Sequence, residues 1–256
     1  MGHNVPSLAK LLEAHGEGWR AFVGSAEHGE SWVAPGVSVG IAGEPSHNLN
    51  WIVCYGPEGV REGIAAAARV LRRRRLPALV FAASPVAPEA AATASELGLV
   101  YAGRIPVMCA HASAVVRADG GHWTRRVTDV EGVQVAGEVL GDAFELPAEW
   151  CQRILGVRFG ARDDAFAFLA LHDGRPVAVA GSAQIGDIAG IYAVGTRRTH
   201  RRRGAGSAAA SAAIDHHLES GAHWFGVLAA PNAEPFYAGL GFVAVDHAST
   251  WVLETA

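Results

Sequence analysis

The stretch Arg201-Arg202-Arg203-Gly204-Ala205-Gly206-Ser207 decides how this sequence is interpreted. The apolar run 188–194 before it predicts a buried strand. The Ala-rich run 207–219 after it predicts a helix, because it contains no Pro and no Gly. Glycines at the start of a helix leave backbone N–H groups open at the positive end of the helix dipole, where an anion binds. Three arginines add positive charge. We therefore expect this stretch to hold a phosphate group, with pyrophosphate as the leading candidate.

Two common phosphate-binding motifs do not explain the stretch. Gly204-x-Gly206-x-x-Ala209 matches the loose dinucleotide fingerprint, but the nine residues 195–203 separate it from its strand. No acidic residue closes the next apolar run, 223–230. A Walker A loop is excluded because no Gly-Lys-Ser or Gly-Lys-Thr follows. Taken alone, the glycines also fit a structural turn beside a solvated arginine run.

A second motif lies downstream, Phe236-Tyr237-Ala238-Gly239-Leu240-Gly241-Phe242. Together with Val194-Gly195-Thr196 and Arg201-x-x-Gly204-x-Gly206, it closely resembles the GNAT family of acyl-CoA N-acyltransferases, over about residues 122–256. That family has V-x-T at the end of its fourth strand, R/Q-x-x-G-x-G/A before a helix, and F-Y-x-x-x-G-F after its fifth strand. The motifs occur here in the same order, separated by the expected helix and strand.

The resemblance implies an N-acyltransferase that moves an acetyl or other acyl group from acetyl-CoA to a primary amine of a small molecule or peptide. The amine would attack directly in a ternary complex. In the family, strands four and five separate, and the pantetheine arm lies between them like an extra strand. The implied cofactor residues are Val194, Gly195, Thr196, Arg201, Arg202, Arg203, Gly204, Ala205, Gly206, Ser207 and Asn232, although Asn232 is closer to Tyr237 than in many relatives.

The resemblance also implies that Tyr237 is the general acid that protonates the leaving thiolate, since a phenol has a pKa of about 10. The general base is not evident. Asp187 and His223 begin the two relevant strands, and water is a third option. A second class of function therefore stays open, a CoA-binding sensor, regulatory subunit or other GNAT-fold protein without transferase activity.

The N-terminal half repeats the pattern of the C-terminal half. Gly63 and Gly98 lie 35 residues apart, as do Gly206 and Gly241, so an offset of 143 relates the two halves (206 − 63 = 143). We predict an α/β fold, layered in the α+β manner, with two GNAT-like domains. Each would be a mixed, mostly antiparallel sheet flanked by helices.

The domains would span 1–119 and 120–256, with the linker at 117–122. The first domain is expected to be degenerate and non-catalytic. It has Glu58 and Glu62 near the position of the anion-binding loop, and Ala94 at the position of Tyr237.

Composition limits the remaining possibilities. Half of the residues are hydrophobic and 18% are charged, with a net charge of −4, as in a soluble globular protein that does not bind nucleic acid. Arginines 72–75 are expected at a helix C-terminus, where cations are favoured. No apolar run of about 18 residues predicts a membrane span. Cys54, Cys109 and Cys151 are expected to be reduced core thiols of a cytoplasmic protein. The histidines lack the spacing of metal ligands, so no metal is expected. A homodimer is one possible oligomeric state.

Overall fold

The computed structural model describes residues 5–118, 123–156 and 159–254, so most of the linker expected at 117–122 lies outside the described residues. The helices are α1 (Leu8–Val23), α2 (Val60–Arg74), α3 (Ala87–Glu96), α4 (Val130–Phe144), α5 (Ala148–Leu155), α6 (Ala205–Glu219) and α7 (Glu234–Gly239). The strands are β1 (Glu30–Ala34), β2 (Val37–Ile41), β3 (Asn50–Cys54), β4 (Ala78–Ala82), β5 (Val100–His111), β6 (Trp123–Arg126), β7 (Ala165–His172), β8 (Arg175–Ile185), β9 (Ile188–Thr196), β10 (Trp224–Leu228) and β11 (Val243–Leu253).

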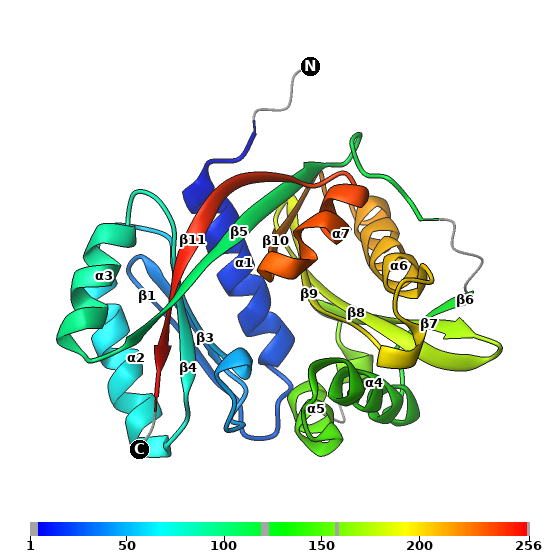
Figure 1. Cartoon of the computed structure of the whole chain (residues 1–256), viewed down its shortest axis with the longest axis horizontal. Coiled ribbons are helices and arrows are strands. Elements are labelled where there is room, and N and C mark those ends of the chain that lie inside the picture. Colours follow the sequence, from blue (N-terminus) through cyan, green and yellow to red (C-terminus); the bar gives the residue numbers. More distant parts are fainter. Residues whose placement is uncertain (1–4, 119–122, 157–158, 255–256) are drawn as a thin grey trace.

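The strands of the described residues form one mixed 11-stranded sheet, in the order β1-β2-β3-β4-β11-β5-β10-β9-β8-β7-β6 (Figure 1). The predicted α/β class, a mixed sheet flanked by helices, is confirmed. The strand pattern also repeats, because β2–β3 and β8–β9 are antiparallel whereas β3–β4 and β9–β10 are parallel. The two sheets expected from the sequence are, however, joined edge to edge into one.

The join is a reciprocal exchange of the last strand of each half. β5 pairs with β10 of the second half, and β11 pairs with β4 of the first half. β5 and β11 also pair with each other, with Val100 opposite Val252 and Cys109 opposite Val243. Adding 143 to 100 gives 243, and adding 143 to 109 gives 252, so the repeat offset interchanges these two pairs. The halves are therefore related by an approximate two-fold axis through this strand pair.

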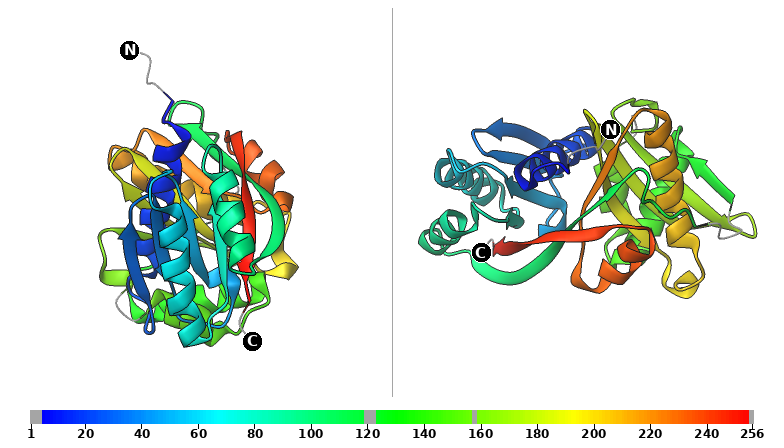
Figure 2. Two further views of the ribbon diagram at one scale, coloured as in Figure 1. Left: turned by 90° about the vertical axis from the view of Figure 1, so that its left-hand side faces the viewer. Right: turned by 90° about the horizontal axis from the view of Figure 1, so that it is seen from above.

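Two layers of helices cover the sheet (Figure 2). α1, α4 and α5 share one core with Tyr192 of β9, whereas α6 and α7 share another with the neighbouring Ile191. Since successive side chains of a strand point to opposite faces, these two cores lie on opposite faces of the sheet. α1 contacts both halves, because it packs on β2 and β3 and also on β8, β9 and β10.

The sequence of α1 explains this position. Ser7 accepts the backbone N–H of Lys10 and caps the helix. Apolar residues at helical spacing then form one buried face. Trp19 of this face stacks on Trp51 of β3, with ring centroids 4.0 Å apart, and lies beside Phe22 at 5.7 Å. Phe22 also packs edge-on against Phe159 of the second half, at a centroid distance of 5.2 Å, so the first helix of the first half contributes to the core of the second half.

The described residues contain no helix that is both long and apolar enough to cross a membrane. Within the same residues, no group of His, Cys, Asp and Glu side chains could hold a metal ion. Cys54, Cys109 and Cys151 are buried free thiols.

Candidate active site

The strands β9 and β10 separate soon after they begin. Their parallel pairing covers only Ile188–Gly190 with Trp224–Gly226. β9 then continues for six residues to Thr196, while β10 stays paired with β5 on its other side as far as Leu228. The edge of β9 that faces β10 is therefore open beyond Gly190, in a form that an extended chain can pair with.

A bulge in β9 lies in this open part. Gly181 of β8 pairs with Tyr192, and Val179 of β8 pairs with Gly195. Two residues of β9, Ala193 and Val194, therefore lie opposite the single residue of β8 between Val179 and Gly181. Ala193 has a φ of 46°, in the left-handed region that non-glycine residues rarely adopt. A bulge re-aims the backbone groups beside it. Here it turns backbone groups away from the regular ladder at the mouth of the gap.

The predicted anion-binding loop follows directly. Arg202 and Gly204 both have left-handed φ values, 63° and 82°, and α6 begins at Ala205 without a side-chain cap. The backbone N–H groups of the first turn of α6 are thus presented at its positive end. A Cβ on Gly206 would lie 2.7 Å from the hydroxyl oxygen of Thr196, so a larger residue would force this hydroxyl to move.

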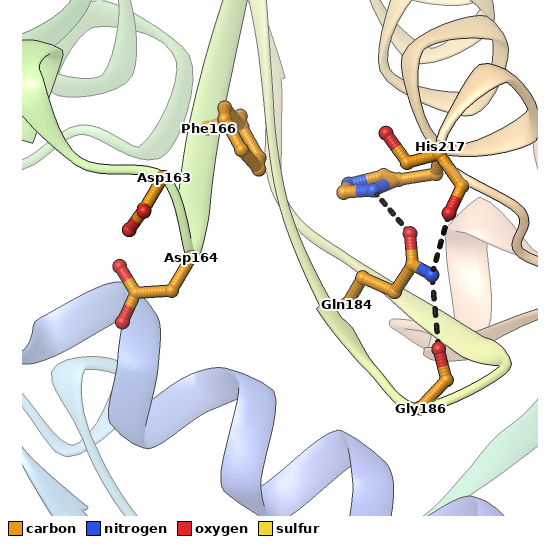
Figure 3. A pocket seen from close by; sticks show the side chains of 7 residues that line it. Asp163, Asp164, Phe166, Gln184, Gly186 and His217 are labelled. Carbon is orange, nitrogen blue, oxygen red and sulfur yellow. Dashed lines mark hydrogen bonds between the residues drawn. The ribbon is translucent and has the colours of Figure 1, made fainter.

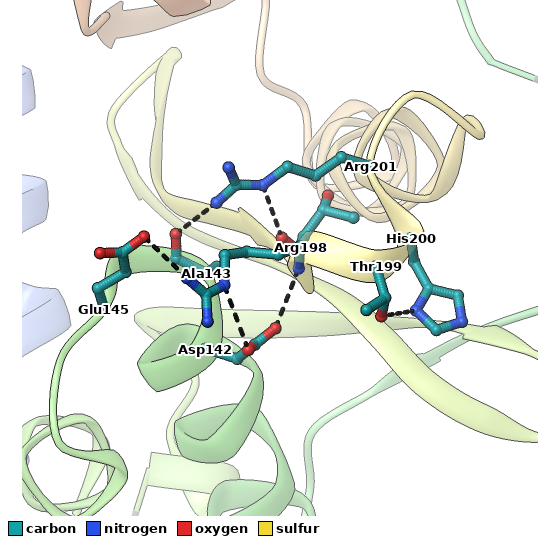
Figure 4. Close-up of polar contacts among 8 residues, drawn as sticks. Asp142, Ala143, Glu145, Arg198, Thr199, His200 and Arg201 are labelled. Carbon is teal, nitrogen blue, oxygen red and sulfur yellow. Dashed lines mark hydrogen bonds and ion pairs between the residues drawn. The ribbon is translucent and has the colours of Figure 1, made fainter.

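The arginines of the loop divide into two groups. Arg201 donates from Nη2 to the carbonyl of Ala143 at 2.8 Å, and Arg198 pairs with Glu145 at 3.2 Å (Figure 4). The backbone N–H of Arg198 also donates to Asp142 at 3.0 Å. These contacts fasten the loop to the end of α4. Arg202 and Arg203 are exposed. The structure thus gives Arg201, predicted as a cofactor residue, a role in holding the loop in place.

Tyr237 lies in α7, which follows β10. Its ring is 6% exposed and packs edge-on against Phe236 and Phe242, at centroid distances of 4.9 and 5.6 Å. Burial raises the pKa of its hydroxyl well above the usual value. The phenol therefore keeps its proton, as a proton donor must. Asn232 lies in the short 3-10 helix Pro231–Ala233 before α7 and is exposed.

The two side chains weighed as general base lie at the closed end of the gap. Asp187 pairs with Lys10 at 2.9 Å, and this contact holds the pKa of the Asp187 carboxyl below its usual range. Its carbonyl accepts the backbone N–H groups of His223 and Trp224, at 2.9 and 3.1 Å. Eight residues of β9 separate this end from Thr196, about 26 Å at the usual rise of a strand. Both candidates therefore lie at the opposite end of the gap from the anion-binding loop, near the residues where β9 and β10 separate.

One buried polar side chain at the gap, His15 of α1, was not predicted from the sequence. Its ring lies 4.6 Å from that of Tyr192, which directly precedes the bulge. A signal existed, since His15 falls on the apolar face of α1 together with Leu11, Leu12 and Trp19. A histidine at such a position is either satisfied in the core or faces a ligand.

A surface pocket of about 280 Å³ lies away from this gap, beside the C-terminus of α6. It is lined by Asp163, Asp164 and Phe166 on one side and by Gln184 and His217 on the other (Figure 3). α6 spans 15 residues, about 20 Å, from its N-terminal loop to this end. We therefore place the candidate site at the gap between β9 and β10, because β9 and the loop before α6 carry most of the predicted cofactor residues, none of which lines the surface pocket.

Comparison with known proteins identifies the family of the segment that contains this gap. Residues 138–242 match the model of the acetyltransferase (GNAT) family, so this segment is a GNAT domain and the family predicted from the sequence is confirmed. It includes β9, the anion-binding loop, α6, β10 and α7. No curated protein sequence matches the chain.

Solved structures match over nearly the whole chain. A GCN5-related N-acetyltransferase from Kribbella flavida is 22% identical, with a TM-score of 0.69, over 97% of this chain and 96% of that one. A tandem GNAT protein from the clavulanic acid biosynthesis pathway is 17% identical, with a TM-score of 0.56, over 86% and 78%. A GCN5-related N-acetyltransferase from Sphaerobacter thermophilus is 14% identical, with a TM-score of 0.56, over 86% and 76%. At these identities the likeness establishes the fold.

Proposed function

We propose that this protein is an N-acetyltransferase that transfers the acyl group of acetyl-CoA to a primary amine of a small molecule or peptide. The observation that carries the proposal is the opening between β9 and β10 beside the uncapped start of α6, within a segment that matches the GNAT family. The second half, 120–256, would be the catalytic domain. The first half, 1–119, would be a degenerate and non-catalytic GNAT-like domain.

The cofactor would bind along β9. Val194, Gly195 and Thr196 would offer their open edge to its pantetheine arm, and the N–H groups of the first turn of α6 would donate to its pyrophosphate. The residues from Ala205 to Ser207 supply those groups, while Arg202 and Arg203 add positive charge. Arg201 contributes indirectly, because it holds the loop against α4.

The chemistry requires few protein groups. The amine nitrogen attacks the thioester carbonyl, and a backbone N–H at the bulge near Ala193 stabilises the oxyanion that forms. The carbon–sulfur bond then breaks, and Tyr237 gives its proton to the sulfur. The proton lost by the amine finally replaces that of Tyr237. The raised pKa of Tyr237 keeps the hydroxyl protonated when the thiolate leaves but makes it a weaker acid, so the hydrogen bond that it donates to the sulfur matters as much as the proton transfer.

One observation favours a CoA-binding protein without transferase activity. Tyr237 belongs to an apolar core with Phe225, Leu240 and Phe242, as expected of a residue that only packs. Release of free thiol from acetyl-CoA in the presence of primary amines separates the two functions. A transferase releases thiol only when an amine is present and forms the matching amide. A binding protein has an affinity for acetyl-CoA in calorimetry but forms no amide.

A further inference from the structure

His15 is a buried histidine whose ring has no hydrogen-bonding partner among the residues that the structure describes. It is 4% exposed, and both Nδ1 and Nε2 are buried without a protein partner. Only its backbone is used, since its carbonyl accepts the hydroxyl of Tyr192 at 2.8 Å. Buried polar groups in proteins are nearly always hydrogen-bonded, so these two nitrogens call for a partner from outside the protein, either a water molecule or a ligand group.

The ring faces the point where β9 and β10 separate. A cavity of about 10 Å³ beside it is lined by Leu11 and Leu12 of α1, Val107 and Met108 of β5, and residues 226–228 of β10. Gly226 is the last residue of β10 that pairs with β9. The cavity has room for one group the size of a water molecule, which is also the size of an amine nitrogen.

The chemistry of the ring suits an amine. Burial lowers the pKa of His15 to about 3, because the charged form cannot be hydrated there. Tyr192 is the titratable side chain that faces the ring, and the other neighbours, from α1, β3, β5 and β10, are apolar. A neutral imidazole offers one lone pair and one N–H. The lone pair is therefore available at any pH at which an amine carries no charge.

We propose that His15 accepts a hydrogen bond from the attacking amine, so that the first half of the chain supplies a residue to the acyl-transfer site of the second. The inference rests on the proposed function and names its substrate class more closely. Because the cavity admits only one small group, we expect the nitrogen to be carried on an unbranched carbon, which needs the least space at the edge of the cavity. His15 then orients the lone pair of the amine nitrogen toward the thioester. If the ring served only to pack the core, it would form no hydrogen bond with the amine.

The test compares His15→Leu with His15→Gln in the full chain. Leucine fills similar space and removes both unpartnered nitrogens, so we expect unchanged or higher thermal stability and unchanged affinity for acetyl-CoA. Amine-dependent thiol release should fall roughly 10- to 100-fold, the usual cost of leaving a buried donor unpaired. His15→Gln retains an acceptor and should recover part of the rate. His217→Leu is the matched control, because it removes a buried histidine that lines the distant pocket.

The amines are n-butylamine, spermidine and Nα-acetyl-lysine amide, with sec-butylamine as the branched counterpart of the first. We expect the wild type to use unbranched amines and to use sec-butylamine at least tenfold more slowly. An active wild type with an equally active His15→Leu variant overturns the role of His15 and leaves the proposed function standing. Equal rates with the two butylamines overturn the substrate class. A wild type that binds acetyl-CoA and acylates none of these amines overturns the proposed function, and the inference with it.

Discussion

The two halves share one strand pattern but differ at the place where a cofactor would enter. In the first half, β3 and β4 are paired from Trp51 with Leu79 to Cys54 with Ala82, which is the end of both strands. In the second half, β9 leaves β10 after Gly190 and bulges at Ala193. The same fold is therefore closed in one copy and open in the other. Under the proposed function, the cofactor would enter at this opening, which the first half lacks.

The helix starts sharpen this comparison. α2 and α6 both have 15 residues and both begin after a left-handed glycine without a side-chain cap, Gly59 and Gly204. The third residue of each helix differs, since Glu62 of α2 stands where α6 has Ser207. A carboxylate there stabilises the helix start itself, and it repels an anion. The first half thus satisfies its helix dipole internally, and the second leaves it for a ligand.

The largest expected effect concerns the dependence of each half on the other. Residues 120–256 produced alone would leave β10 without β5, and β11 without both β4 and β5. Unpaired strands are exposed edges that aggregate. We expect this fragment to show no cooperative thermal transition and to elute early from gel filtration, as aggregates do. A monomeric fragment with dispersed amide resonances would contradict this expectation.

Tyr237→Phe tests the proposed chemistry. Loss of one positioned acid typically lowers a rate by roughly 10²–10⁴-fold. We expect such a fall in turnover, while the affinity for acetyl-CoA in calorimetry barely changes. Tyr101→Phe, at a strongly exposed site on β5, is the control and should be fully active. Full activity of Tyr237→Phe would instead assign the ring to core packing.

Ser207→Glu transfers the first half's residue to the second. We expect the affinity for acetyl-CoA to fall by at least about tenfold, which is about 1.4 kcal/mol, because the carboxylate faces the pyrophosphate. Thermal stability should stay the same or rise, since acidic residues suit the first turn of a helix. Ala92→Glu, at an exposed position of α3, is the control for the added charge. An unchanged affinity for acetyl-CoA would mean that the pyrophosphate does not bind at the start of α6.

The smallest effect is a dependence of stability on pH. The pKa of His15 is about 3 in the folded protein and about 6.5 when unfolded, so the unfolded chain alone binds this proton between those values. His15 therefore lowers stability as the pH falls below about 6.5. Between pH 5 and 6, denaturant titrations should show a change in unfolding free energy that is smaller for His15→Leu by about 1.2 kcal/mol. An identical slope in both proteins would mean that His15 is not buried as described.

Much of this arrangement follows from local sequence. The glycines and arginines of 201–207 predict an anion-binding helix start because their effect is confined to a few adjacent residues. The repeat predicts the strand pattern, and the offset of 143 holds for β5 and β11. It does not hold for the helices, where Val60 and Ala205 begin α2 and α6 at an offset of 145, because the loops differ in length.

Other features depend on contacts between distant residues. The exchange of β5 and β11 leaves no trace in sequence, since a strand has the same composition whichever neighbour it pairs with. The role of Arg201 is also not local, because it depends on the end of α4 lying beside the loop. His15 was missed for the same reason. It lies in the first half, and only the course of α1 across the sheet brings it to β10.

The exchanged strands give this chain the arrangement of a domain-swapped dimer fused into one polypeptide. Between separate chains, such an exchange weakens on dilution. Within one chain, the two partners meet at an effective concentration that is roughly millimolar for a short connection. Assembly of the gap between β9 and β10 is then independent of how much protein is present. The first half has no tyrosine at position 94 and no opening between β3 and β4. It is still required for the gap in the second half, because it provides β5, the neighbouring strand of β10.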